Sequence, residues 1–188
     1  MEDGYGRPPD LTAARAHWRA KKRSQPAERE AIGPGEESVW DYPRPPRLEP
    51  AHRPVRALLA GRVVAASTRA LRVVETGSPP VYYVPPGDVV PGLFVKSELE
   101  SFCEWKGLAR YFDLRVGDVR AENAAWSYPE PDEGFEPLRD FLAIYPGRAL
   151  ACYLGDERVR AQPGHFYGGW VSDGIKGPFK GEPGTEDW

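Results

Sequence analysis

The alternation of apolar and polar positions from residue 55 onward predicts a succession of short strands. Turn residues separate these segments at the spacing expected of an all-β sandwich or barrel-like domain. The predicted strands are residues 55–60, 63–67, 71–76, 81–84, 108–114, 119–128, 141–145, 149–154 and 159–161.

Two of the predicted hairpins have a glycine-containing connection. The first turns at Gly61-Arg62, a glycine-first pair, and the second at Gly77-Ser78. If Thr76 lies opposite Pro79 in the second hairpin, Arg72 lies opposite Tyr83, within reach of a cation–π contact.

The stretch from Cys103 to Tyr111 predicts a strand with large rings on one face. Alternate side chains of a strand share a face, so Trp105 and Tyr111 flank a gap formed by Gly107 and Ala109. We expect something to fill this gap.

A third hairpin joins this strand to residues 119–128, and residues 115–118 allow two turn centres. A turn at Val116-Gly117 places Gly107 opposite Trp126, whereas a turn at Gly117-Asp118 places Ala109 there. Both turns put four large rings on one face: Trp105, Tyr111, Trp126 and Tyr128. Because the opposite face is also apolar, a second layer or a ligand should cover the aromatic side.

Polar residues from separate segments of the middle of the chain accompany these rings. A mostly apolar cleft with a few convergent polar groups is typical of small-molecule sites, and lysine and arginine favour an anionic or carbonyl-bearing ligand. The predicted ligand-binding residues are Arg72, Glu75, Tyr83, Trp105, Lys106, Tyr111, Trp126 and Tyr128. The alternative is that the rings form an ordinary core. No catalytic residue is predicted, and the ligand and any cofactor remain open.

Residues 10–23 predict the one convincing helix, with Asp10 as its N-cap. Five basic residues within it could contact phosphate or RNA, or could form a solvated face: Arg15, Arg19, Lys21, Lys22 and Arg23.

The length of 188 residues predicts one domain with peripheral ends. We divide the chain into a basic helix and linker (1–36), a β domain (37–162) and a glycine-rich tail (163–188) that wraps the domain. The 21 prolines and 20 glycines predict many turns.

The formal charge of −3 makes nucleic acid an unexpected partner for the whole domain. The two cysteines, Cys103 and Cys152, indicate no disulfide framework. Because the histidines are far apart and no Cys-x-x-Cys pair exists, no metal site is predicted. With no apolar leader and no long apolar run, a cytoplasmic location without a membrane partner is expected. The oligomeric state is left open.

Several segments in order resemble domain-of-unknown-function family four-two-seven, which is also catalogued under nucleotidyltransferases. They include residues 37–43, 69–75, 79–85, 88–89, 103–111 and 123–129. The resemblance implies a mainly β fold in which two antiparallel sheets pack at a steep angle, like a tent. It implies no established chemistry.

Three functions are compatible with these residues. The first is a small-molecule-binding β domain. The second is a nucleotide-dependent, nucleotidyltransferase-like enzyme, although the chain has no Asp-x-Asp pair and residues 177–181 lack the order of a P-loop. The third is an interaction module that uses the basic helix to bind RNA or a protein. The first is the predicted function.

Overall fold

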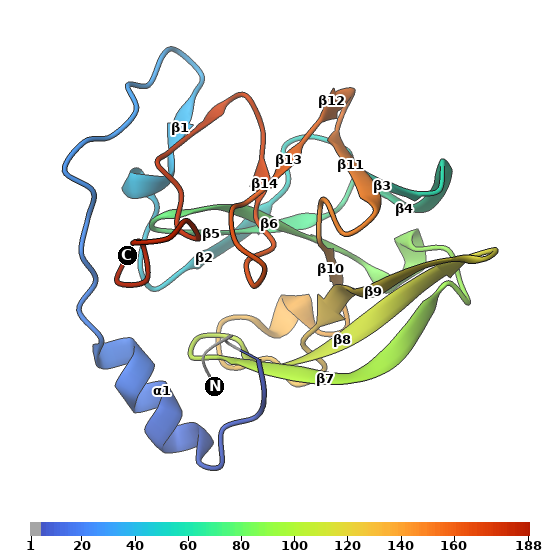
Figure 1. Ribbon diagram of the computed structural model, residues 1–188, viewed down its shortest axis with the longest axis horizontal. Coiled ribbons are helices and arrows are strands. Elements are labelled where there is room, and N and C mark those ends of the chain that lie inside the picture. Colours follow the sequence, from blue (N-terminus) through green and yellow to red (C-terminus); the bar gives the residue numbers. More distant parts are fainter. Residues whose placement is uncertain (1–4) are drawn as a thin grey trace.

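The computed structural model describes residues 5–188 and confirms a mainly β protein with one short helix (Figure 1). The larger sheet has seven antiparallel strands in the spatial order β2 (Arg47–Pro50), β5 (Leu71–Glu75), β6 (Ser78–Val84), β10 (Leu142–Ile144), β9 (Val119–Ser127), β8 (Gly107–Val116) and β7 (Phe94–Cys103). The smaller has four, in the order β12 (Glu157–Arg158), β11 (Leu150–Leu154), β3 (Val55–Leu59) and β4 (Arg62–Ser67). Residues 1–4, which belong to the predicted N-terminal segment, lie outside the residues that the structure describes.

Two short pairs and three 3₁₀ turns complete the fold. The pairs are β1 (Glu37–Ser38) with β15 (Ile175–Lys176), which run parallel, and β13 (Arg160–Ala161) with β14 (Trp170–Val171). The 3₁₀ turns are η1 (Val39–Asp41), η2 (Pro86–Asp88) and η3 (Glu136–Leu138).

The main core lies between the two large sheets. Inward-facing residues of both sheets, such as Leu59, Val64, Leu114 and Ile144, are fully buried there. Trp170 of β14 joins them and donates its indole N–H to the Ile144 carbonyl at 2.9 Å. Burial of these side chains supplies the hydrophobic stabilisation of the two-sheet arrangement.

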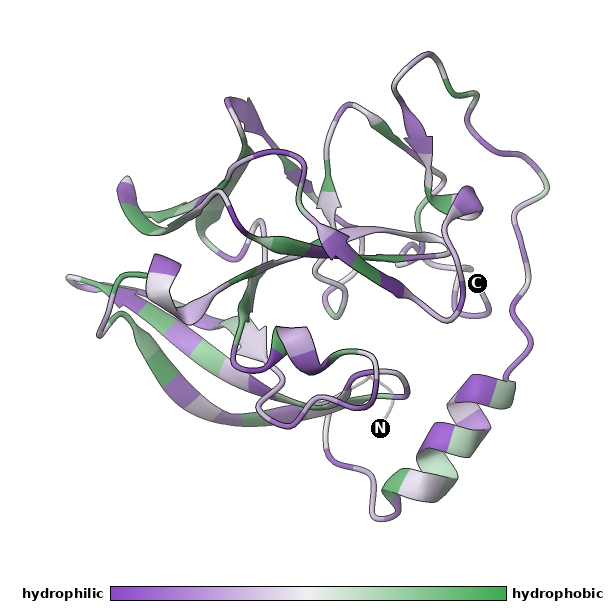
Figure 2. Ribbon diagram, turned by 180° about the vertical axis from the view of Figure 1, so that it is seen from behind, coloured by the Kyte–Doolittle hydropathy of each residue, from purple (hydrophilic) through white to green (hydrophobic). Residues whose placement is uncertain are grey.

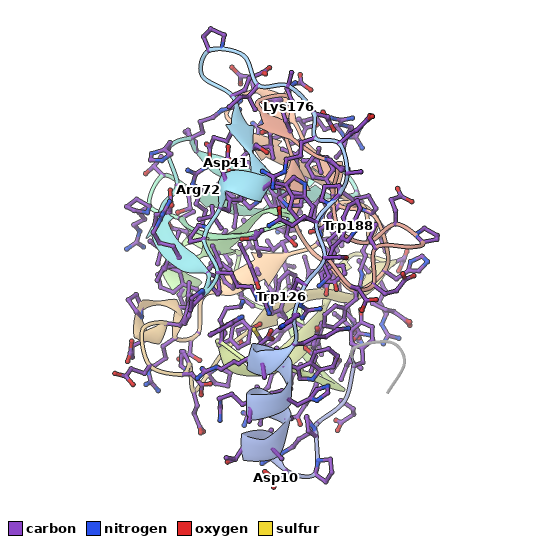
Figure 3. The ribbon with its side chains drawn as sticks, turned by 90° about the vertical axis from the view of Figure 1, so that its left-hand side faces the viewer. Asp10, Asp41, Arg72, Trp126, Lys176 and Trp188 are labelled. Carbon is purple, nitrogen blue, oxygen red and sulfur yellow. The ribbon has the colours of Figure 1, made fainter. Side chains whose placement is uncertain are left out.

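An aromatic layer covers the opposite face of the seven-stranded sheet. Its buried members are Val73, Tyr83, Ala109, Tyr111, Trp126, Tyr128, Phe135, Leu138, Ala143 and Tyr145. Trp126 lies deep in the molecule (Figure 3). A Cβ atom at position 168 would stand 2.2 Å from the Trp126 ring, so only glycine lets the tail pack there. The tail therefore closes part of the aromatic face.

The C-terminal tail wraps the domain as expected. Trp40 donates its indole N–H to the Pro178 carbonyl at 2.9 Å and meets Trp188 edge to face. Together with Ile175 of β15, these contacts form a third apolar cluster.

Helix α1 (Leu11–Ala20) is confirmed, and Asp10 caps it by accepting from the backbone N–H groups of Thr12 and Ala13. No residue of α1 is buried. The helix stands outside the sheets, and a long extended segment connects it to β1 (Figure 1), so it contacts the domain only through side chains. Hydrophilic and hydrophobic residues alternate along the helix (Figure 2). We call residues 5–36 the N-terminal arm.

Two predicted registers are wrong. In the β5–β6 hairpin Arg72 pairs with Tyr82, not with Tyr83, and a β-bulge separates Val73 from Glu75. The first hairpin turns at Ala60-Gly61 rather than at Gly61-Arg62, because Leu59 pairs with Arg62.

The β8–β9 hairpin turns at Gly117-Asp118, one of the two predicted centres, but a bulge then changes its register. Asn123 at the bulge has a φ of 47°, and Trp126 pairs with Tyr111 rather than with Gly107 or Ala109. The shift spans two residues, so the predicted faces are preserved.

The prediction of a continuous strand from Cys103 to Tyr111 is also wrong. Strand β7 ends at Cys103, Glu104–Lys106 form a turn, and β8 begins at Gly107. Trp105 and Lys106 are thus turn residues, and Trp105 does not lie on a strand face. Within residues 5–188, no helix has the length and apolar content needed to cross a membrane.

Candidate functional site

The β7–β8 turn is held in a tight conformation by its surroundings. Gly107 has a φ of +92°, which favours glycine. A Cβ atom there would approach Asp132 Oδ1 to 3.2 Å and the Glu130 carbonyl to 3.3 Å. The loop at 129–132 therefore packs directly on the turn, and the Asp132 N–H donates to the Lys106 carbonyl at 3.2 Å.

The turn places Lys106 in an aromatic environment. Lys106 is 8% exposed, and its Nζ lies 5.7 Å from the ring centre of Phe135 and 5.9 Å from that of Tyr128. Both rings are buried, so their faces can stabilise an ammonium group. Among residues 5–188, no carboxylate forms an ion pair with Lys106.

Three polar groups near Lys106 favour its charged form. Burial lowers the pKa of Lys106, but Cys103, Tyr83 and Glu75 outweigh burial and hold this pKa above its usual range. Burial also raises the pKa of the Cys103 thiol, and it raises the pKa of Tyr83 to about 12.

Glu75 is already engaged by an arginine. Arg44 Nη1 donates to Glu75 Oε1, and its Nη2 donates to Glu104 Oε1 at 2.8 Å. The three side chains are between 15% and 23% exposed. This bridged triad holds β5, the segment after η1 and the β7–β8 turn together, and Lys106 keeps a positive charge without a bonded counter-ion.

Two further donors beside this triad have no partner. The Trp105 ring lies between Arg19, at 4.8 Å, and Arg44, at 5.5 Å, and its Nε1 is buried without a hydrogen bond among residues 5–188. Arg23 Nη2 stands 3.9 Å from Glu104, while Arg23 Nε is likewise buried and unsatisfied. Unsatisfied buried donors are rare and cost free energy.

Lys180 of the tail adds another cation. Its Nζ lies 5.2 Å from the Tyr167 ring centre. Burial, together with the nearby Arg23 and Arg44, lowers the pKa of Lys180 to about 8, although Glu75 and Glu104 raise it. No carboxylate among the described residues forms an ion pair with it.

The predicted site residues separate into three groups. Five gather around the β7–β8 turn: Glu75, Tyr83, Trp105, Lys106 and Tyr128. Together with Cys103 they form what we call the Lys106 site.

Tyr111 and Trp126 lie farther along the aromatic layer and are packed by their neighbours. They stack on each other with ring centres 6.4 Å apart, Tyr5 meets Tyr111 edge to face, and Ser101 bonds the Tyr111 hydroxyl at 2.9 Å. Their arrangement is that of a core.

Arg72 does not lie with the others. The wrong register explains this, because pairing with Tyr82 directs Arg72 away from the Tyr83 side. Its guanidinium binds Glu37 at 2.9 Å and Glu49 at 2.8 Å and is 8% exposed. These two carboxylates satisfy its charge.

The prediction omitted four charged residues that border the Lys106 site: Arg23, Arg44, Glu104 and Lys180. Each stood in a noticeable pattern. Arg23 belongs to the basic run, Arg44 follows Trp40-Asp41-Tyr42-Pro43, and Lys180 lies among the glycines of the tail. No signal in the sequence indicated that these distant segments meet.

A surface hollow of about 600 Å³ lies elsewhere, at Ser67, Arg69 and Asp88. Its polar groups satisfy one another, since Ser67 donates to Asp88 at 2.6 Å and Arg69 binds the same carboxylate at 2.8 Å. The buried donors without a partner lie at the β7–β8 turn instead, and we therefore place the candidate site at Lys106. Among residues 5–188, no three His, Cys, Asp or Glu side chains gather as a metal site would require.

The fold and the site together define a β protein with a donor-rich, aromatic-lined polar centre. A family model described as a domain of unknown function (DUF427), with the name NTP_transf_9, matches residues 47–155. The match covers more than half of the chain, so the chain belongs to this family. The matched segment contains the whole β7–β8 hairpin and every residue of the Lys106 site. No curated protein matches the chain.

Proposed function

We propose that the chain is a small-molecule-binding β domain and that Lys106 binds an anionic group of its ligand. The observation that carries this proposal is a lysine that is 8% exposed and forms no ion pair among residues 5–188, in the same turn as Trp105, whose indole N–H is unsatisfied. A carboxylate or phosphate group at the turn would give Lys106 a counter-ion, and an oxygen that accepts from the Trp105 N–H would remove an unfavourable burial.

The aromatic rings around Lys106 give the ligand an apolar contact surface. The Tyr128 hydroxyl makes no hydrogen bond within residues 5–188 and adds a polar group for orientation. Sites for small molecules combine these features, a mostly apolar wall and few convergent polar groups.

Access to the site depends on the N-terminal arm, which lies across the β7–β8 turn. The arm is fixed by Arg15 to Asp132 at 2.6 Å, by Arg19 Nε to the Glu104 carbonyl at 2.8 Å and by Lys21 to Asp187 at 3.0 Å. Partly exposed ion pairs of this kind contribute about 0–1 kcal/mol each. Backbone N–H groups of Gly6, Ser24 and Glu30 hold the arm on both sides of α1. Since α1 itself buries no residue, the helix can move aside at lower cost than the rest of the arm and admit a ligand.

A thermal-shift panel of small carboxylates and phosphates, including a nucleoside triphosphate with Mg²⁺, tests the proposal. The ligand class should raise the melting midpoint of the wild type and leave that of Lys106→Met unchanged. Lys96→Met, which removes an exposed lysine of β7, is the matched control and should respond as the wild type does.

Without a ligand, Lys106→Met should melt at or above the wild-type midpoint, because methionine fills similar volume and removes a buried charge without a counter-ion. Equal shifts in the wild type and in Lys106→Met would contradict the proposal. A lack of shift across the whole panel would contradict it as well. A shift confined to the triphosphate with Mg²⁺ would favour the nucleotide-dependent function that the family name suggests.

A further inference from the structure

The Lys106 site carries more positive than negative charge. Four partly or fully buried cations surround it: Arg23, Arg44, Lys106 and Lys180. Two carboxylates, Glu75 and Glu104, accompany them, and both bond to Arg44. Four cations and two carboxylates leave an excess of two positive charges.

The excess is concentrated on the side formed by the arm and the tail. Arg44 is satisfied by two carboxylates. Among residues 5–188, Arg23 forms a single ion pair, with Glu104 at 3.9 Å, lies over the Trp18 ring at 5.8 Å and leaves Nε unsatisfied. Lys180 forms no ion pair among the described residues and sits over the Tyr167 ring at 5.2 Å. Arg23 and Lys180 thus form a second group of donors. They belong to the arm and the tail, the two segments that flank the body of the domain in sequence.

We propose that Arg23 and Lys180 form a second anion contact of the Lys106 site, and that the site binds a small molecule with two negative charges. A phosphate monoester and a dicarboxylate share this chemistry. This inference rests on the proposed function, because Lys106 and Trp105 hold one end of the same ligand.

The arm and the tail already meet through backbone bonds from Ser24 to Asp187 and from Glu30 to Gly177. A dianion between Arg23 and Lys180 would neutralise two like charges that repel each other and would tie the arm to the tail. Charge-assisted hydrogen bonds to both side chains would then add to the weak surface pairs that hold the arm.

Calorimetric titration with three aromatic probes tests the inference: phenyl phosphate, phthalate and benzoate at pH 7. Phenyl phosphate and phthalate each carry more negative charge than benzoate, and they represent a phosphate monoester and a dicarboxylate. Phenyl phosphate, phthalate or both should bind the wild type more tightly than benzoate does. Benzoate binding as tightly as both would overturn the inference.

The variants Lys180→Gln and Arg23→Gln should each weaken the preferred dianion about tenfold or more. Their affinity for benzoate should stay within about twofold of the wild type, because one charge is held by Lys106. Matched controls are Lys176→Gln, a tail lysine paired with Glu36, and Arg29→Gln, an arm arginine paired with Asp41. Lys180→Arg keeps the charge and should retain dianion affinity, which separates loss of charge from damage to the fold.

The two proposals fail differently in this experiment. If benzoate and the dianions bind through Lys106 but do not respond to Lys180→Gln or Arg23→Gln, the second contact is wrong and the proposed function stands. If Lys106→Met leaves the affinity of all three probes unchanged, or if none of them binds the wild type, both are wrong.

Discussion

At the scale of single residues, the charge of Lys180 changes just above neutral pH. Burial and the nearby Arg23 and Arg44 lower its pKa to about 8, against the opposing effect of Glu75 and Glu104. Tyr167, the ring beneath it, has its pKa raised by burial to about 12 and stays neutral. The charge of Lys180 is therefore lost as the pH rises through about 8.

This titration predicts a pH dependence of ligand binding. Affinity for phenyl phosphate should decline as the pH rises from 7 to 9.5, by up to about tenfold per pH unit above the pKa of Lys180. The variant Lys180→Arg should bind with little change over the same range, since arginine stays charged. Titrations at several pH values measure the effect, and parallel profiles for wild type and variant would contradict it.

The lowered pKa of Lys180 also determines how the free energy of unfolding changes with pH. The pKa of Lys180 in the folded chain lies below its ordinary value of 10.5, so the unfolded chain binds more protons between about pH 8 and 10.5. The free-energy cost of the charged amine is present in full below pH 8 and disappears as the pH rises through this window. A cation that destabilises the ligand-free fold is typical of a binding site rather than of a structural contact.

At the scale of elements, the bulge at Asn123 fixes how β9 presents its aromatic residues. Asn123 adopts a φ of 47°. Its N–H donates to Asp113 Oδ1 at 2.9 Å, and its side-chain oxygen accepts from the Ser97 hydroxyl at 2.6 Å. Asparagine tolerates this left-handed conformation better than other non-glycine residues do.

The conformation of the bulge predicts that two substitutions of Asn123 lower the free energy of unfolding to different extents. Asn123→Val should lower the free energy of unfolding by about 1–3 kcal/mol more than Asn123→Gly, because a β-branched residue is strained at positive φ. Both variants lose the bond to Ser97, so their difference isolates the backbone effect. Urea denaturation measures it, and equal stability of the two variants would show that the bulge does not depend on this conformation.

The β7–β8 turn is the element that assembles the candidate site, and local sequence patterns did not predict a turn there. Residues 104–106 contain no glycine, proline or asparagine, so alternation favoured a continuous strand. The only glycine, Gly107, ends the turn with a φ of +92°. With a turn there, Cys103 and Lys106 come close together, whereas on a straight strand they would face opposite sides.

At the scale of the whole molecule, the fold class and the aromatic layer could be predicted, because period-two alternation and turn residues depend on local sequence. The helix was equally local, since Asp10 caps it directly. The position of Arg72 could not be predicted, because it depends on a register set by a bulge between Val73 and Glu75.

For a related reason, local sequence patterns could not predict which residues form the site. Arg23, Arg44 and Lys180 come from the arm, the segment after η1 and the tail. They meet because the arm packs against the β7–β8 turn at Glu104 and the tail against the β5–β6 turn at Gly77. Tertiary packing, rather than any motif, brings these cations together.

The central claim is that Lys106 holds an anionic ligand, and untargeted mass spectrometry of co-purifying small molecules tests it most directly. Wild-type protein and Lys96→Met should carry the same acidic compound, and Lys106→Met should lack it. A compound retained equally by all three proteins, or an absence of any compound enriched on the wild type over Lys106→Met, would contradict the account.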